Sequence, residues 1–276
     1  MNGVVRIVIA CLSSGIVLSG CSDSKAREGT GAFSTDAPRS FATSDQVLSQ
    51  RELDAAVAAM PEASDFSYVL DHDVLAPLLS TEGTVHAGEG WAAVTTVADP
   101  VTGEDYTIRS VSRVTEQWMQ MDEWTDAQSG CWLPMTATQV PVGIQALRAE
   151  RPVPYLLLDE ITATGDGYTA PFGLAAQLFT VQATESLGWN DLLRSTTSIP
   201  VDIVATDGVV TSMRVEATDL LNVEPAPKKA PPAQVAIIRG IDVLITFDEG
   251  QSYDDAPPEP STIIRPGEQD CGGRSS

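Results

Sequence analysis

The chain has little positive charge. Its 276 residues include 16 Lys and Arg against 38 Asp and Glu, which gives a net charge of −22. A surface this acidic repels phosphate backbones, so the composition excludes nucleic-acid binding. It equally excludes docking on anionic lipid headgroups through a basic patch.

Side chains that usually build catalytic and metal centres are also scarce. The two histidines, His72 and His86, lie near the ends of expected strands, and neither has a helical i, i+4 partner. A G-x-S-x-G motif is absent, and the S-x-x-K match at 22–25 lies in a polar segment that cannot hold a nucleophile and a base rigidly together. The acidic stretch at 248–255 lacks the EF-hand ligand spacing. We therefore expect no enzymatic activity, no metal and no cofactor.

Long apolar runs are missing except at the start of the chain. Arg6 precedes the apolar run Ile7–Val17, which is too short to cross a membrane as a helix, and Leu18-Ser19-Gly20-Cys21 ends it. This arrangement resembles a bacterial lipobox, in which the cysteine is diacylated and becomes the first residue after cleavage. The alternative is a plain signal peptide with an incidental cysteine, or a short N-terminal anchor.

The resemblance to a lipobox implies a location. Residues 1–20 would be a lipoprotein signal peptide, and Cys21 would carry fatty acyl chains of the palmitate type. Two or more such chains attach a protein stably to a bilayer, whereas one does so marginally. Residues 21–42 are rich in Ser, Gly, Ala and Thr without an apolar period, and predict a flexible tether. We expect an extracytoplasmic protein, anchored to the cell membrane through Cys21.

The four cysteines then divide into two kinds. Cys11 leaves with the signal peptide and Cys21 is acylated, so Cys131 and Cys271 remain. An even pair in an oxidising compartment predicts a Cys131–Cys271 disulfide, with two unpaired thiols as the alternative.

Alternating apolar and polar residues predict strands over most of the remaining chain. A capping-box spacing at 43–46 predicts that a helix begins there and ends before Pro61. Two further helices are expected at 142–151 and 155–162, the second too apolar to lie on the surface. Asp207-Gly208 between two alternating runs predicts a hairpin. The expected strands cover 66–70, 91–97, 106–114, 177–186, 199–206, 209–218 and 241–250.

These elements predict one α+β domain at 43–262, followed by a C-terminal tail at 263–276. Nearly every strand has one apolar and one polar face, so the sheet is expected to be antiparallel and covered by helices on one side.

The order of these elements is similar to that of the actinobacterial LprG/LppX-type lipoproteins, which share the fold of the LolA-type lipoprotein carriers. The resemblance covers about residues 43–262, and the positions that carry it are Pro200, Asp207, Gly208, Asp248, Gly250 and Pro257. It implies a strongly curved antiparallel sheet, a half-barrel, with helices on its concave face. It also implies an apolar cavity between them that binds or carries an acylated lipid.

The residues expected to line such a cavity are inward positions of strands and of the apolar helix: Ile108, Leu156, Leu157, Ile161, Val181, Ile203, Val215 and Val243. The same pattern also fits a filled core, because binary patterning does not distinguish a cavity from a packed interior. In that alternative the protein is a non-catalytic interaction or sensor lipoprotein with an envelope protein as its partner.

The lipobox hypothesis makes a direct prediction. Replacing Cys21 with Ala removes the thiol that would be acylated, so the variant should move from the detergent phase to the aqueous phase in detergent phase partitioning. Retention of Cys21→Ala in the detergent phase, in a host lacking any partner, would show that the hypothesis is wrong.

Overall fold

The structure is a computed structural model, and the residues that it describes all lie in a compact unit at Thr43–Ser276. They are 47–61, 63–72, 79–86, 89–98, 105–113, 116–121, 130–135, 152–179, 196–223, 235, 239–249, 258–264 and 271. The lipobox, the tether and the helix expected at 142–151 lie outside them.

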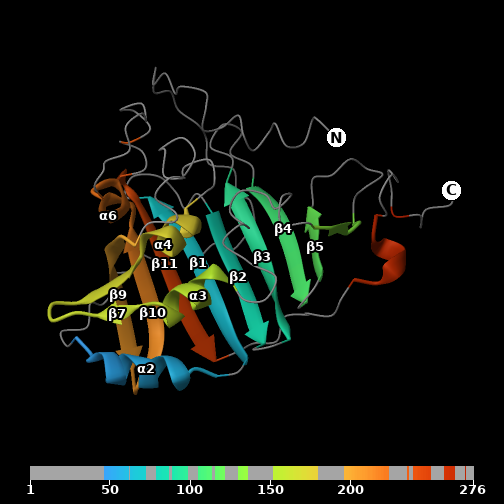
Figure 1. The fold of residues 1–276 in the computed structure, drawn as a ribbon. Helices are drawn as coiled ribbons and strands as arrows, with labels where there is room; N and C mark the ends of the chain where they lie inside the picture. The colour runs from blue at the N-terminus through green and yellow to red at the C-terminus, as the bar shows by residue number, and fades with distance from the viewer. Residues whose placement is uncertain are drawn as a thin grey trace, which may run out of the picture. The chain divides into compact units, whose positions relative to one another are not determined.

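The described residues form an open, antiparallel sheet of eleven strands with helices, which confirms the expected α+β fold class. The strand order is β6-β5-β4-β3-β2-β1-β11-β10-β9-β8-β7 (Figure 1). The strands are β1 (Ala63–His72), β2 (Leu79–His86), β3 (Gly90–Ala98), β4 (Asp105–Arg113), β5 (Glu116–Met121), β6 (Leu133–Pro134), β7 (Thr162–Ala163), β8 (Tyr168–Pro171), β9 (Ser198–Thr206), β10 (Val209–Glu216) and β11 (Ile241–Glu249).

Two meanders build this sheet. Strands β1 to β6 each pair with the next along the chain, and so do β7 to β11. The meanders meet where β1 pairs with β11, in a register that runs from Ser64↔Glu249 to His72↔Ile241. The β9–β10 turn is the predicted Asp207-Gly208 hairpin, and both residues have the positive φ that such a turn needs (53° and 79°).

One face of the sheet, here called the inner face, carries the core. Alternation along the strands places Phe66, Ile108, Ile203, Val215 and Val243 on it, and all five are buried in one continuous cluster. The outer face carries the polar partners of the alternation, as expected for Asp202, Arg214 and Glu216. This one-sided pattern is the reason that the helices pack on a single side.

Four helices are described: α2 (Gln50–Ala58), α3 (Val153–Asp159), α4 (Phe172–Leu178) and α6 (Ala217–Leu221). The first begins later than the capping box at 43–46 predicted, because a second capping box is formed by Ser49 and Glu52. The backbone N–H of Glu52 donates to the side chain of Ser49, and the backbone N–H of Ser49 donates to the side chain of Glu52. The hydrogen bonds from Ser49 lower the pKa of Glu52.

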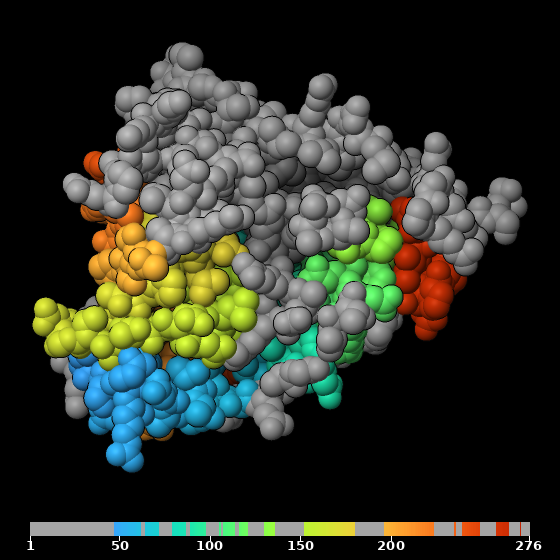
Figure 2. Space-filling view, viewed as in Figure 1, coloured from blue at the N-terminus to red at the C-terminus, as the bar shows by residue number. Residues whose placement is uncertain are grey.

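Helix α2 also protects one edge of the sheet. The side-chain amide of Gln50 accepts from the backbone N–H of Ala163 in β7 (2.7 Å) and donates to the carbonyl of Ile161 (3.2 Å). It thus pairs with the edge strand as a peptide group would. In Figure 2 this helix (blue) lies against the segment that carries α3, β7 and β8 (yellow).

Several predicted elements differ from the structure. The strand expected at 177–186 is wrong at its start, because Gln177 and Leu178 belong to α4 and Phe179 is its C-cap. Residues 180–186 lie outside the described residues. The helix expected at 155–162 begins two residues earlier and ends at Asp159, since Pro154 is accommodated in its first turn. Strand β2 was not predicted, since Glu82 and Gly83 interrupt its apolar pattern.

The outer face is not polar throughout. Ala92, Val111 and Trp118 form a second buried cluster there, covered by Trp132 and Ile263. Val111 therefore departs from the polar face expected on β4. The adjacent residue Ile264 is 5% exposed and belongs to the main core. The first two residues of the segment predicted as a tail at 263–276 thus pack against opposite faces of the sheet.

Gly83 occupies a site with no room for a side chain. A Cβ there would lie 2.5 Å from the carbonyl oxygen of Ala92, 2.8 Å from the Phe66 ring and 2.9 Å from the Cβ of Ala93. Because Phe66 is the cross-strand neighbour of Gly83, the ring leans over the glycine. The glycine in this strand is therefore a packing requirement.

This crowding predicts that Gly83→Ala lowers the unfolding free energy by about 1–3 kcal/mol, the usual cost of overpacking. Gly167→Ala is the matched control, because nothing lies within 4 Å of its Cβ and its φ is an ordinary one. Urea unfolding of both variants measures the difference. Equal midpoints for the two would contradict the proposed close contact.

Candidate ligand-binding face of the sheet

The inner face has two parts, and the first is centred on β1 and β11. There Tyr155 of α3 packs edge-on against Phe66 (centroids 5.9 Å apart) and against Phe247 (5.1 Å). The hydroxyls of Tyr155 and Ser64 form a buried hydrogen bond of 2.7 Å. A buried tyrosine needs such a partner, so this bond holds α3 over the centre of the sheet (Figure 1).

Helix α4 is held in the same region by a second tyrosine. The hydroxyl of Tyr68 on β1 donates to the backbone carbonyl of Leu178, the last residue of α4. Burial raises the pKa of Tyr68, so this hydroxyl stays protonated and remains a donor. Phe172, at the start of α4, is fully buried. This part of the inner face is a packed core.

The second part, on β2 to β4, carries smaller side chains. Cross-strand register forms a row in which Phe66 is followed by Gly83, Ala93, Ser110 and Met119 on successive strands. The three central residues extend no farther than a Cβ or a hydroxyl. A row of small side chains therefore runs between a phenylalanine ring and a methionine, and we call Gly83, Ala93 and Ser110 the small-residue row.

Hydroxyl groups surround this row. On one side Thr81 and Thr95 share a buried hydrogen bond of 2.9 Å between their Oγ1 atoms. Ser112 lies on the other side and is fully buried. Ser110 is 3% exposed, and its Oγ has no hydrogen-bond partner in the structure. A buried hydroxyl without a hydrogen-bond partner destabilises the fold by about 1–3 kcal/mol. The unpaired Oγ of Ser110 therefore needs a physical explanation.

The structure buries most of the side chains expected to line a cavity. Ile108, Leu157, Ile161, Ile203, Val215 and Val243 all belong to the main core cluster, whereas Leu156 is half-buried and Val181 lies outside the described residues. No pattern along the sequence indicates the small-residue row. Its members are far apart along the chain, and cross-strand register alone brings them together.

A cluster of charges lies on the outer face of β9 to β11. Arg214 contacts Asp242 (2.6 Å) and Glu216 (2.9 Å). Burial lowers the pKa of Arg214, but the hydrogen bond and charge of Asp242 outweigh it and the net shift is upward. Burial raises the pKa values of Glu216 and Asp219. Both carboxyls bind protons more tightly in the folded chain, so the stability that they contribute at low pH is lost as pH rises through their folded pKa values.

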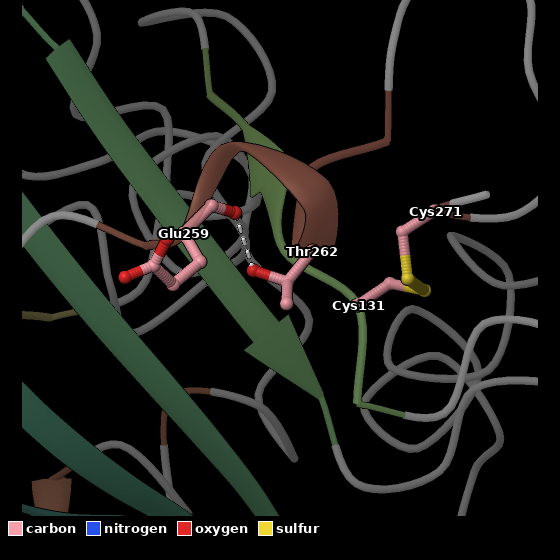
Figure 3. Close-up of a disulfide and its surroundings, with 4 residues drawn as sticks. All are labelled: Cys131, Glu259, Thr262 and Cys271. Atoms are coloured by element: carbon pink, nitrogen blue, oxygen red, sulfur yellow. Dashed lines mark hydrogen bonds between the residues drawn. A yellow bond between two sulfur atoms is a disulfide. The ribbon is translucent and has the colours of Figure 1, made fainter. Parts of the chain in front are cut away.

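The predicted disulfide is present. Cys131 and Cys271 are bonded, with Cα atoms 5.7 Å apart, and Cys131 is buried in the main core (Figure 3). The chain preceding Cys271 is also tied to β6, because the backbone of Trp132 donates to Thr262 (2.8 Å) and accepts from Ile264 (2.9 Å). The turn between Glu259 and Thr262 is closed by a side-chain hydrogen bond of 2.7 Å. The C-terminal segment thus protects the second edge of the sheet.

Metal-binding and membrane-spanning features are missing from the part of the chain that the structure describes. There, no three His, Cys, Asp or Glu side chains come close enough to hold a metal ion. Nor does any helix in these residues combine the length and the apolar character needed to span a bilayer.

Comparison with known proteins adds little to this geometry. No family model matches this chain, and no curated protein matches it. Among solved structures it is similar to a LolA superfamily protein, NE2245 from Nitrosomonas europaea, at 10% identity and a TM-score of 0.29. That match covers 76% of this chain and 96% of the other. A likeness this remote carries no argument about function, and the LprG/LppX resemblance stays a prediction.

The disulfide should contribute substantially to stability. Its cysteines are 140 residues apart, and closing so long a loop stabilises by up to about 5 kcal/mol in the chain-entropy model. Replacing both cysteines with serine should lower the unfolding free energy by about 2–5 kcal/mol, measured by urea unfolding. Thiol labelling of the exported wild-type protein is the control. Two reactive thiols there, or an unchanged midpoint in the double variant, would contradict this prediction.

Proposed function

We propose that this protein is a cell-envelope lipoprotein that binds or carries an acylated lipid against the inner face of its sheet. It has no catalytic role in this proposal. Cys21 supplies the membrane anchor, and the inner face shelters acyl chains from water. Burial of each methylene group contributes about 0.8 kcal/mol, so a long chain is held without any specific polar contact.

The width of the apolar face is the observation that supports this proposal best. The inner face is buried from β9 to β5, which are eight neighbouring strands, and it is mostly apolar, with serine and threonine hydroxyls on β1 to β4. At about 4.8 Å per strand, this face is roughly 35 Å wide. Helices α3 and α4 have seven residues each, and each is about 10 Å long. Their anchors lie on β1 and β11, so of the face as the structure describes it these two helices cover the part over the central strands. In this proposal a lipid lies over β2 to β5.

The aromatic packing over β1 and β11 supports a second candidate function. The packing of Tyr155 between Phe66 and Phe247, with Val243 and Ile245 fully buried, is a filled core. If the packing over β2 to β5 is equally complete, the fold is a scaffold that displays acidic loops to an envelope protein partner. The two functions differ in whether the purified protein contains lipid.

The lipid-binding proposal is tested with the full chain carrying Cys21→Ala, purified without detergent. Organic extracts of this protein should contain acylated lipid, detected by mass spectrometry. Adding Ala93→Met places a long side chain on the inner face, where the acyl chain would lie. Overpacking an occupied site costs about 1–3 kcal/mol, so this variant should reduce the lipid recovered by at least about fivefold.

Val94→Met is the matched control, because Val94 is the next residue of β3 and lies on the outer face. It should leave the recovered lipid unchanged, and thermal unfolding checks that both variants fold. If the extracts hold no lipid and acyl-chain probes fail to bind, lipid binding is wrong and the filled scaffold is favoured.

A further inference from the structure

We propose that the hydroxyl of Ser110 binds the carbonyl group that joins an acyl chain to the headgroup of the lipid. The small-residue row would be the subsite for that carbonyl, while the acyl chains extend over the aliphatic side chains on either side. This inference rests on the proposed lipid-binding function and assigns it a ligand class, a neutral acyl ester or amide.

The unpaired hydroxyl is the first observation. Ser110 is 3% exposed, yet its Oγ lacks a partner in the structure. Other hydroxyls of this face have partners: Thr81 pairs with Thr95, Ser64 pairs with Tyr155, and Tyr68 donates to the carbonyl of Leu178. The Ser110 hydroxyl, in contrast, is available to a ligand. It can donate to a carbonyl oxygen, which has no donor of its own to offer.

The small neighbours of Ser110 are the second observation. Ala93 is the cross-strand neighbour of Ser110 on β3, so the side chain next to the hydroxyl in that direction is a single methyl group. Gly83 follows on β2, and the Phe66 ring leans over it and closes the row at that end. Met119 on β5 and Ile108 on β4 flank the row with apolar surface. In this proposal the polar linkage lies at the hydroxyl, and the apolar chains lie against Met119 and Ile108.

Charge indicates which lipids the subsite would accept. Among the residues that the structure describes, no charged side chain is buried. The buried serine and threonine hydroxyls of the inner face are those of Ser64, Thr81, Thr95, Ser110 and Ser112. A free fatty acid would bury a carboxylate, and a buried charge without a counter-ion is strongly unfavourable. An ester or amide carbonyl is neutral and needs one donor. The inner face therefore favours an esterified or amide-linked chain over a free acid.

The experiment compares two synthetic lipids of equal chain length: a diacylglycerol with two ester carbonyls and the dialkylglycerol in which ethers replace them. Binding is measured by fluorescence displacement on the full chain carrying Cys21→Ala. This protein should bind the diester about tenfold more tightly than the diether, the effect of one well-placed hydrogen bond. Adding Ser110→Ala should remove this preference by weakening the diester and leaving the diether unchanged.

Ser80→Ala is the matched control, since Ser80 lies on β2 at an outer-face position. It should preserve the tenfold preference. The melting temperature of Ser110→Ala provides a separate readout, because loss of an unsatisfied hydroxyl should leave the unliganded protein at least as stable as before.

The outcomes separate the two proposals. If both lipids bind but Ser110→Ala keeps the ester preference, or no preference exists, the carbonyl subsite is overturned while lipid binding stands. If neither lipid binds any variant, lipid binding is overturned and the subsite with it. A marked fall in the melting temperature of Ser110→Ala would show that the hydroxyl has a partner within the fold, and this too would overturn the subsite.

Discussion

The pairing of β1 with β11 is the contact on which the rest of the structure depends. These strands come from opposite ends of the domain, and their register extends over nine residue pairs from Ser64↔Glu249 to His72↔Ile241. Each meander alone would expose a long, apolar strand edge at this position. Bringing the edges together requires a large loop to close, but the entropy cost of closure grows slowly with loop length. The joined sheet then presents one inner face wide enough for a common core.

The helices are organised around this central pair of strands. Tyr68 on β1 holds the end of α4, and Ser64 on the same strand holds Tyr155 of α3. Because both bonds are buried, breaking either would leave a tyrosine hydroxyl or its partner without a hydrogen bond. Such contacts fix the position of a helix more strictly than apolar packing does, since apolar packing has no direction. They concentrate the large aromatic side chains over β1 and β11.

Much of the fold could be predicted from patterns along the sequence. The period-two alternation of Val243 and its neighbours, and the Asp207-Gly208 turn, are local signals that the structure confirms. Features that depend on distant partners were missed. Val111 is apolar on the outer face because Trp132 and Ile263 cover it, and no local pattern indicates that cover. Strand β2 was missed because Gly83, whose absent side chain makes space for Phe66, weakens the alternation.

The candidate site illustrates the same limit more sharply. Along β3 and β4, Ala93 and Ser110 are unremarkable positions in alternating strands, and a sequence pattern assigns both to an inner face. Cross-strand register gives these residues their significance, because it places them in one row with Gly83.

A filled core and a ligand-binding face share the same alternation of apolar and polar residues, but they differ in side-chain size from strand to strand. On β1 and β11 the row holds Phe66 and Phe247, which fill space under α3, whereas on the next three strands it holds small side chains and an unpaired hydroxyl. Side-chain size alone does not decide between the two, because the Phe66 ring fills the space above Gly83 from within the chain. The buried hydroxyl of Ser110 is the feature that this packing leaves unexplained, since a hydroxyl without a partner destabilises a core.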